Sequence, residues 1–276
     1  MKRFLVHSLL VLALAAPIFG QEAATGPQPK SQAELDTLLA IQNAPDADSR
    51  IEASQKLLTD FTDSDFKEFA LNMIMVSYQE KNDFENMLVY GERALEENAE
   101  NVQVLVQLAV AIPMRTREFD LDKEEKLSKA ESYAQRAIKI LPTLESPNPN
   151  MTPEQWLLVK KDAMSQSHEA LGSVALARKN FTEAETSFRQ ALTVAGEQNP
   201  LTFLKLGQSL MEQGKYDEAI TVLDKAIALG GVPTPTGGDL AALFKQDVIK
   251  LKESGAPPPS QQQQSTSDVP QVEIVQ

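Results

Sequence analysis

The sequence predicts an all-α protein in which helix–turn–helix units stack as an α-solenoid. Apolar residues recur at helical spacing between residues 31 and 254, with few of the alternating stretches that are typical of β-strands. A segment near residue 170 is also repeated 35 residues further along. Its members Gly172, Ala184, Phe188 and Ala191 return as Gly207, Ala219, Leu223 and Ala226. A repeat of this length, with small residues where two helices would cross, indicates a stacked unit.

Composition and charge exclude several classes of function. The chain of 276 residues is 42% hydrophobic and 24% charged, it has a formal charge of −13, and it contains no cysteine. An acidic chain without a basic patch argues against nucleic acid as a partner, since phosphate backbones are bound by clustered Lys and Arg. The absence of cysteine excludes disulfides, thiol catalysis and cysteine-ligated zinc.

The first twenty residues have the pattern of a secretory signal peptide. Lys2 and Arg3 precede an apolar run from Phe4 to Ala16, and we expect cleavage after Gly20. The run is shorter than the roughly 20 residues needed to cross a bilayer, although an uncleaved N-terminal anchor is the alternative. Loss of Lys2 and Arg3 would change the formal charge from −13 to −15. We therefore expect an exported protein, periplasmic or secreted, with no membrane span in the mature chain.

A polar linker at 21–30 leads into a predicted repeat domain at 31–254. Its first helix begins at Ser31, where Ser31 and Glu34 have the spacing of a capping box. Further helices are expected at 46–60, 65–81, 84–97, 102–112 and 121–140.

The segment around Pro147 and Pro149 interrupts the helical pattern. A long helix is then expected at Pro153–Lys179, because Thr152 and Gln155 form a second capping box with proline in the first helical position.

The C-terminal part of the sequence divides into a helix and a tail. Residues 239–254 read as an amphipathic helix, which would cap the last repeat with one solvated face. Residues 255–276 contain three consecutive prolines and four consecutive glutamines. Because this segment lacks the apolar content that would offset the entropy of ordering, we expect a disordered tail.

The repeated residues follow the pattern of a known family. Large and small residues alternate in a fixed order in the clearest copy, at Phe203, Leu206, Gly207, Leu210, Ala219, Leu223 and Ala226. The preceding copy has His168, Leu171, Gly172, Ala175, Ala184, Phe188 and Ala191. This order resembles the tetratricopeptide repeat. About five units fit between Glu34 and Gly231, one of them lengthened near Pro113–Leu121. The resemblance implies a right-handed α-solenoid closed by the C-terminal capping helix.

The same resemblance implies a concave groove lined by the first helix of each unit. The groove positions carried over from the family are Asn72, Val76, Gln79, Gln103, Val106, Val110, Glu169, Ser173, Leu204, Gln208 and Met211. Relatives that clamp a terminal carboxylate use Lys at such positions, and none of these residues is Lys. A lining of amides and aliphatic groups suits an extended peptide or an amphipathic helix. The alternative is that several of these residues only pack.

Nothing in the sequence indicates catalysis. His168 is the only histidine after residue 20, and it occupies a position where the family has a large packing residue. We expect no cofactor, no metal and no enzymatic activity. The sequence thus predicts an exported scaffold or adaptor that binds a partner protein or peptide in envelope assembly or secretion. The alternative is a structural protein of the cell envelope that forms homo-oligomers. We expect the partner to contact the two interruptions of the repeat pattern, Pro113–Leu121 and Pro147–Trp156.

Overall fold

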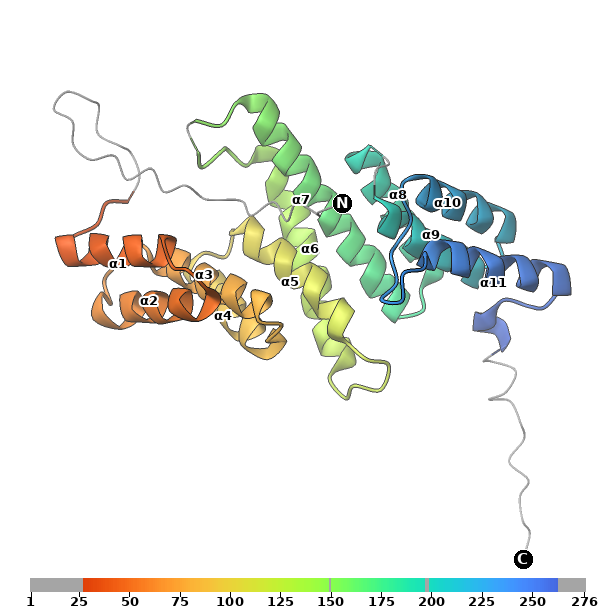
Figure 1. Ribbon diagram of the computed structural model, residues 1–276, viewed down its shortest axis with the longest axis horizontal. Helices are drawn as coiled ribbons and strands as arrows, with labels where there is room; N and C mark the ends of the chain where they lie inside the picture. The colour runs from red at the N-terminus through yellow and green to blue at the C-terminus, as the bar shows by residue number, and fades with distance from the viewer. Residues whose placement is uncertain (1–26, 149, 197–198, 263–276) are drawn as a thin grey trace, which may run out of the picture. The chain divides into compact units, whose positions relative to one another are not determined.

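Figure 1 shows a computed structural model of the chain, which describes residues 27–148, 150–196 and 199–262. These residues are almost entirely helical, and their only strand-like feature is an isolated bridge between Pro233 and Asp239. The helices of the described part are α1 Gln32–Gln42, α2 Ala47–Asp60, α3 Lys67–Glu80, α4 Phe84–Glu97, α5 Val102–Arg115, α6 Lys123–Ile140, the 3-10 turn η1 Leu141–Thr143, α7 Pro153–Ala177, α8 Phe181–Ala195, α9 Pro200–Glu212, α10 Tyr216–Ala228 and α11 Leu240–Ser254. The predicted all-α class is confirmed.

The helices belong to two compact units. The first contains the chain up to Val104 together with Thr143–Leu157, and the second contains Leu105–Pro142 and the chain from Leu158 onward. In the first unit α1 packs on α2, α2 on α3, and α3 on α4. In the second unit α8 packs on α9, α9 on α10, and α10 on α11. Packing of consecutive helices confirms the predicted stack of helix–turn–helix units.

The core of the first unit lies between its first three helices. It is formed by the buried side chains Leu38, Ile41, Leu57, Phe66 and Ala70. Further along, the rings of Tyr78 and Tyr90 stack with their centroids 5.5 Å apart, which joins α3 to α4. The guanidinium group of Arg93 lies 5.1 Å from the centre of the Tyr90 ring.

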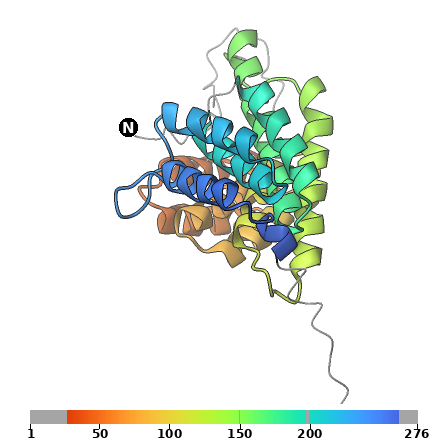
Figure 2. The ribbon, with the colours of Figure 1, turned by 90° about the vertical axis from the view of Figure 1, so that its right-hand side faces the viewer.

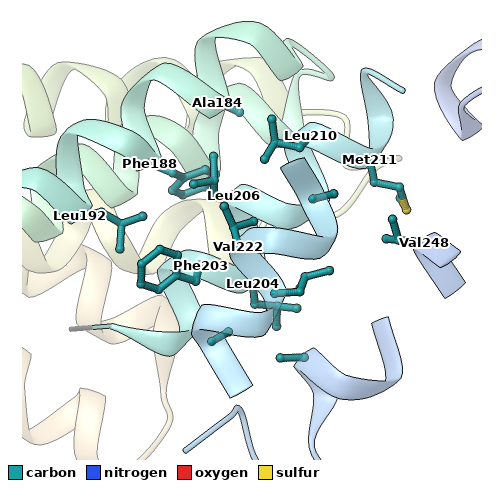
Figure 3. Packing of buried hydrophobic residues seen from close by; sticks show 14 of the residues in the cluster. Ala184, Phe188, Leu192, Phe203, Leu204, Leu206, Leu210, Met211, Val222 and Val248 are labelled. Atoms are coloured by element: carbon teal, nitrogen blue, oxygen red, sulfur yellow. The ribbon is translucent and has the colours of Figure 1, made fainter. Parts of the chain in front are cut away.

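Helix pairs in the second unit cross where a glycine meets a bulky side chain. A Cβ atom on Gly172 of α7 would lie 2.6 Å from the ring of Phe188 in α8. One on Gly207 of α9 would lie 2.9 Å from the Leu223 side chain in α10. Figure 3 shows Phe188 beside Leu206 within the surrounding apolar cluster. The 35-residue repeat is therefore the spacing between two equivalent helix crossings.

Helix α7 begins as the sequence predicts. The Thr152 amide donates to the Gln155 side chain at 3.0 Å, and the Gln155 amide donates to the Thr152 hydroxyl at 3.3 Å, which completes a reciprocal capping box. The Trp156 indole N–H donates to the Leu144 carbonyl at 2.9 Å and ties the preceding loop to the helix. With 25 residues, α7 is about 37 Å long.

The C-terminal end of α5 departs furthest from the prediction, while α3, α6 and α7 differ from it by one or two residues at an end. Helix α5 was expected to end at residue 112, but it continues through Pro113 to Arg115. Proline removes one hydrogen-bond donor and disfavours a helical conformation of the residue before it. Near the C-terminal end of a helix, this weakens only the hydrogen bonding of the last turn. The Thr116 amide and hydroxyl both donate to the Ile112 carbonyl, at 3.0 and 2.8 Å, and close the helix.

The first residues of the expected disordered tail are ordered against the second unit. The Tyr216 hydroxyl donates to the Ala256 carbonyl at 3.1 Å, and the Ser260 hydroxyl donates to the Glu212 carbonyl at 2.7 Å. In residues 255–262 polar groups thus bind backbone and side-chain groups of α9 and α10, which are contacts that the sequence did not predict. Residues 263–276 lie outside the described residues.

The predicted signal peptide, residues 1–20, also lies outside the part that the structure describes. Among the described helices, none combines the length and the apolar character that crossing a bilayer requires.

We expect Gly172→Ala to destabilise the chain by about 1–3 kcal/mol, because the added methyl group overpacks the crossing with Phe188. Helix propensity alone would give the opposite sign, a gain of roughly 0.5–1 kcal/mol. Urea denaturation followed by circular dichroism measures the change. The double variant Gly172→Ala, Phe188→Leu should recover part of the loss. A stabilised single variant would contradict the close contact.

Candidate functional site

Ten of the eleven predicted groove residues occupy three equivalent positions, here called rows, along the first helices α3, α5, α7 and α9, and Gln103 lies three residues before Val106. The first row is Asn72, Val106, Glu169 and Leu204. The second row, four residues further along each helix, is Val76, Val110, Ser173 and Gln208. The third row includes Gln79 and Met211, seven residues after the first. Because residues four and seven apart lie on one face of a helix, the rows of each helix point the same way.

The first row lies in the packing between helices. Asn72, Val106 and Leu204 are 7%, 4% and 9% exposed. The fourth member, Glu169, is half-buried, and its carboxylate accepts hydrogen bonds from the Asn199 side chain at 2.8 Å and from the Thr202 hydroxyl. These residues hold neighbouring helices together, and little of their surface is open to a ligand.

Ser173 in the second row is also occupied. Its hydroxyl donates to the Glu169 carbonyl at 2.8 Å and accepts from the Lys205 ammonium at 2.9 Å. Burial lowers the pKa of Lys205, which the charge of Glu169 partly opposes. Ser173 thus serves as a contact between α7 and α9.

Five predicted residues keep an accessible surface. In the first unit Val76 and Gln103 are half-buried and Gln79 is exposed. In the second unit Val110 is half-buried and Gln208 is exposed. Met211, by contrast, is only 7% exposed, and Figure 3 shows it beside Val248 of the capping helix α11.

Asn72 differs from the other buried residues because its side-chain oxygen has no hydrogen-bond partner among the described residues. It lies on α3 one turn before Val76 and two turns before Gln79. An unsatisfied buried polar group costs about 1–3 kcal/mol, so this oxygen lowers the stability of the folded chain.

The sequence analysis did not predict a hydrogen bond between an asparagine and a glutamate that recurs in both units. Asn101 accepts the Val104 amide at 3.0 Å, and its side-chain NH₂ donates to Glu68 of α3 at 2.5 Å. Asn199 likewise accepts the Leu201 amide at 3.0 Å while donating to Glu169 of α7. In each case the asparagine caps one first helix and binds the preceding one. The asparagine before each helix was a visible signal, but its carboxylate partner lies 33 or 30 residues earlier.

His168 lies where the sequence places a packing residue. It borders an open depression on the α8 side, lined also by Thr186, Arg189, Gln190, Thr193 and Val194. Its Nδ1 atom is buried and has no hydrogen-bond partner in the described part of the chain. Burial lowers its pKa below the ordinary 6.5. The described residues also contain no cluster of three or more potential metal ligands.

Comparisons with known proteins agree with this geometry. A family model described as "Tetratricopeptide repeat" matches residues 202–229, which comprise most of α9 and all of α10. No curated protein sequence matches the chain significantly.

Among solved structures, PilW, a type IV pilus biogenesis factor, aligns with a TM-score of 0.53 at 15% identity, over 88% of this chain and 96% of that one. TTC0263, a TPR protein of Thermus thermophilus, aligns at 0.48 with 17% identity over 79% and 100%. PilF of Pseudomonas aeruginosa aligns at 0.47 with 18% identity over 84% and 95%.

The fold defines a class of protein built from stacked helix–turn–helix repeats. Residues 202–229 match the tetratricopeptide repeat, and Gly207 and Leu223 within this match make one of the crossings that stack the helices.

We expect the stability of the chain to fall as the pH drops from 7.5 to 5.5, with His168 as the source. Because burial lowers its pKa in the folded chain, the unfolded chain takes up this proton first, and stability is lost as the pH falls through about 6.5. Urea denaturation of residues 21–276 at pH 7.5, 6.5 and 5.5 measures the slope. His168→Phe should flatten it, and an unchanged slope in that variant would exclude His168 as the cause.

Proposed function

We propose that this protein is a non-enzymatic scaffold that binds a partner protein or peptide on the exposed face of its first helices. The proposed ligand is an extended peptide or an amphipathic helix. Support comes from the repeat fold, whose stacked first helices are suited to such binding, and from the uncharged character of the accessible residues.

The accessible pair of Val76 and Gln79 on α3 is the observation that carries the proposal. Val76 offers an aliphatic contact and Gln79 offers an amide, and the two lie on the same face of the helix. The Gln79 side chain can both donate to and accept from the main chain of an extended ligand. The combination favours recognition of peptide backbone together with a small apolar side chain.

The second unit offers a weaker surface of the same kind. Val110 and Gln208 supply an aliphatic group and an amide, while the nearby ammonium of Lys205 is engaged by Ser173. This arrangement gives no free cation to clamp a ligand carboxylate. The proposed ligand therefore contributes uncharged groups to the contact.

We further propose that the protein acts in envelope assembly or secretion after export to the periplasm or the cell exterior. The proposal depends on the predicted signal peptide at 1–20. PilW is itself a pilus biogenesis factor, but at 15% identity the likeness concerns the fold, so the pathway is proposed on the export signal.

We expect Gln79→Leu and Val76→Asp to lower partner capture from envelope extracts at least tenfold. Gln79→Leu removes the proposed amide from an exposed position, so it should leave the free energy of unfolding nearly unchanged. Val76→Asp places a charge on the proposed surface. The matched control is Val89→Asp, since Val89 is 52% exposed on the second helix α4. Capture of the same partners by all three variants would contradict the proposal.

A self-assembling role is the second candidate, and exposed leucines around α11 favour it. Leu229 and Leu240 are each 43% exposed and Leu243 is 51% exposed, so the capping end of the repeats presents an apolar surface. Patches of this kind mark interaction surfaces when they are contiguous.

If self-assembly is the function, the mass of residues 21–276 measured by light scattering should rise with concentration. The double variant Leu240→Ser, Leu243→Ser should then remain monomeric. A wild-type mass that stays monomeric at all concentrations would exclude this candidate and leave the peptide-binding proposal intact.

A further inference from the structure

The loop between α5 and α6 presents large apolar side chains to solvent. Phe119 is 93% exposed and Leu121 is 107% exposed, and Met114 at the end of α5 is 66% exposed. No other large apolar residue of the described chain exceeds 66%. Single exposed apolar residues are common, but three within eight positions of one loop form a surface that favours a covering segment.

This exposure does not result from a loose loop. The Glu118 carboxylate binds the ammonium groups of Lys123 and Lys179 at 2.8 and 2.9 Å, and these two lysines lower the pKa of Glu118 to about 2. The Asp120 carboxylate accepts the Arg117 amide at 3.0 Å and pairs with Lys126 at 3.4 Å. The loop is held by its own ion pairs, and it nevertheless directs its apolar side chains away from the fold.

The charged side chains of the loop that make no ion pair with a described residue are positive. The side chains of Arg115 and Arg117 are exposed, and neither guanidinium group makes an ion pair with a described residue. The acidic groups beside them are engaged, since Glu118 and Asp120 face lysines and Asp122 pairs with Lys126 at 2.9 Å. A covering segment that matched this surface would be apolar and acidic.

The C-terminal segment leaves the described structure along the same edge of the second unit. Lys179, which binds the loop, follows α7, and its positive charge acts on the Glu212 carboxylate at the end of α9. The Glu212 carbonyl accepts the Ser260 hydroxyl at 2.7 Å, and the ring of Pro258 lies against Gly214. Figures 1 and 2 both show the loop after α5 and the turn near residue 260 at the lower edge of this unit.

The sequence after Gln262 has the required character. Residues 263–276 include Val269, Val272, Ile274 and Val275. They also include Asp268 and Glu273 but neither Lys nor Arg. Fourteen residues can extend over roughly 46 Å, and Lys179 is linked both to Glu118 in the loop and to Glu212 near the start of this segment.

We propose that residues 268–276 of this chain bind over Met114, Phe119 and Leu121, with Asp268 and Glu273 facing Arg115 and Arg117. Tethering makes this binding intramolecular, with an effective concentration in the millimolar range for a short linker, so that a modest affinity suffices. The segment would cover the loop where we expected a partner to make contact, and such a partner would have to displace it. This inference does not depend on the peptide-binding surface of the first helices.

Because the chain has no cysteine, engineered pairs can test the contact directly. Asp122→Cys with Gln271→Cys places one thiol beside the loop and one in the segment without removing an apolar residue. The control is Gln246→Cys with Gln271→Cys, since Gln246 is exposed on α11 of the same unit. Residues 21–276 of each variant are equilibrated in glutathione redox buffers, and the effective concentration of the two thiols is read from the oxidised fraction of monomer.

We expect an effective concentration at least tenfold higher for the 122–271 pair than for the 246–271 pair. Phe119→Ser with Leu121→Ser should reduce the first value to that of the control, and Arg117→Glu should reduce it at least threefold while Arg117→Lys leaves it unchanged. Equal values for the two pairs would overturn the proposal, because they would show only random encounters. Disulfides found solely between chains would also overturn it, because the occupant would then be a second copy.

Discussion

The close approach of a glycine on one helix to a bulky side chain on the next sets the geometry of the second unit. The ring of Phe188 packs against Gly172 and the side chain of Leu223 packs against Gly207, at separations that leave no room for a methyl group. The bulky partners are fully buried, so each crossing joins the two helices of a pair through the interior. The rotation of α7 and α9, and therefore the side chains that they direct outward, depends on these contacts. The helix surface that remains accessible in the second unit therefore follows from where the glycines lie.

This dependence explains what could be predicted from the sequence and what could not. The crossings leave a local, periodic signal of glycine and alanine at fixed offsets, so the fold class and the equivalence of the two clearest repeats could be predicted. The exposure of each groove residue also depends on the neighbouring first helix. Leu204 and Glu169 occupy equivalent positions, yet Leu204 is buried in the apolar core while Glu169 binds Asn199. The family pattern assigns a position along each helix, but it gives no information about such neighbours.

The hydrogen bonds between asparagine and glutamate could not be predicted from the sequence either, because the partners lie about 30 residues apart. Asn101 and Asn199 are ordinary N-cap residues in the sequence, and only the folded chain shows that each also binds a glutamate of the preceding first helix. The contacts of residues 255–262 were also not predictable from the sequence. They are single hydrogen bonds to the Glu212 carbonyl and from the Tyr216 hydroxyl, and the segment has no periodic pattern of apolar residues that would indicate packing. Composition predicts the absence of a core in that segment, but it does not predict docking onto a neighbouring turn.

Different forces hold the helix crossings and the exposed loop, and this distinction bears on how each can respond to its surroundings. The crossings are apolar and buried, so salt has little effect on them. The loop at 116–122 is held by ion pairs between exposed groups, and pairs of this kind are weak and are screened by salt. Because Glu118 ionises with a pKa of about 2, mild acid leaves these pairs in place. Ionic strength can therefore loosen the loop while the repeats stay stacked, whereas mild acid acts first on the buried imidazole of His168.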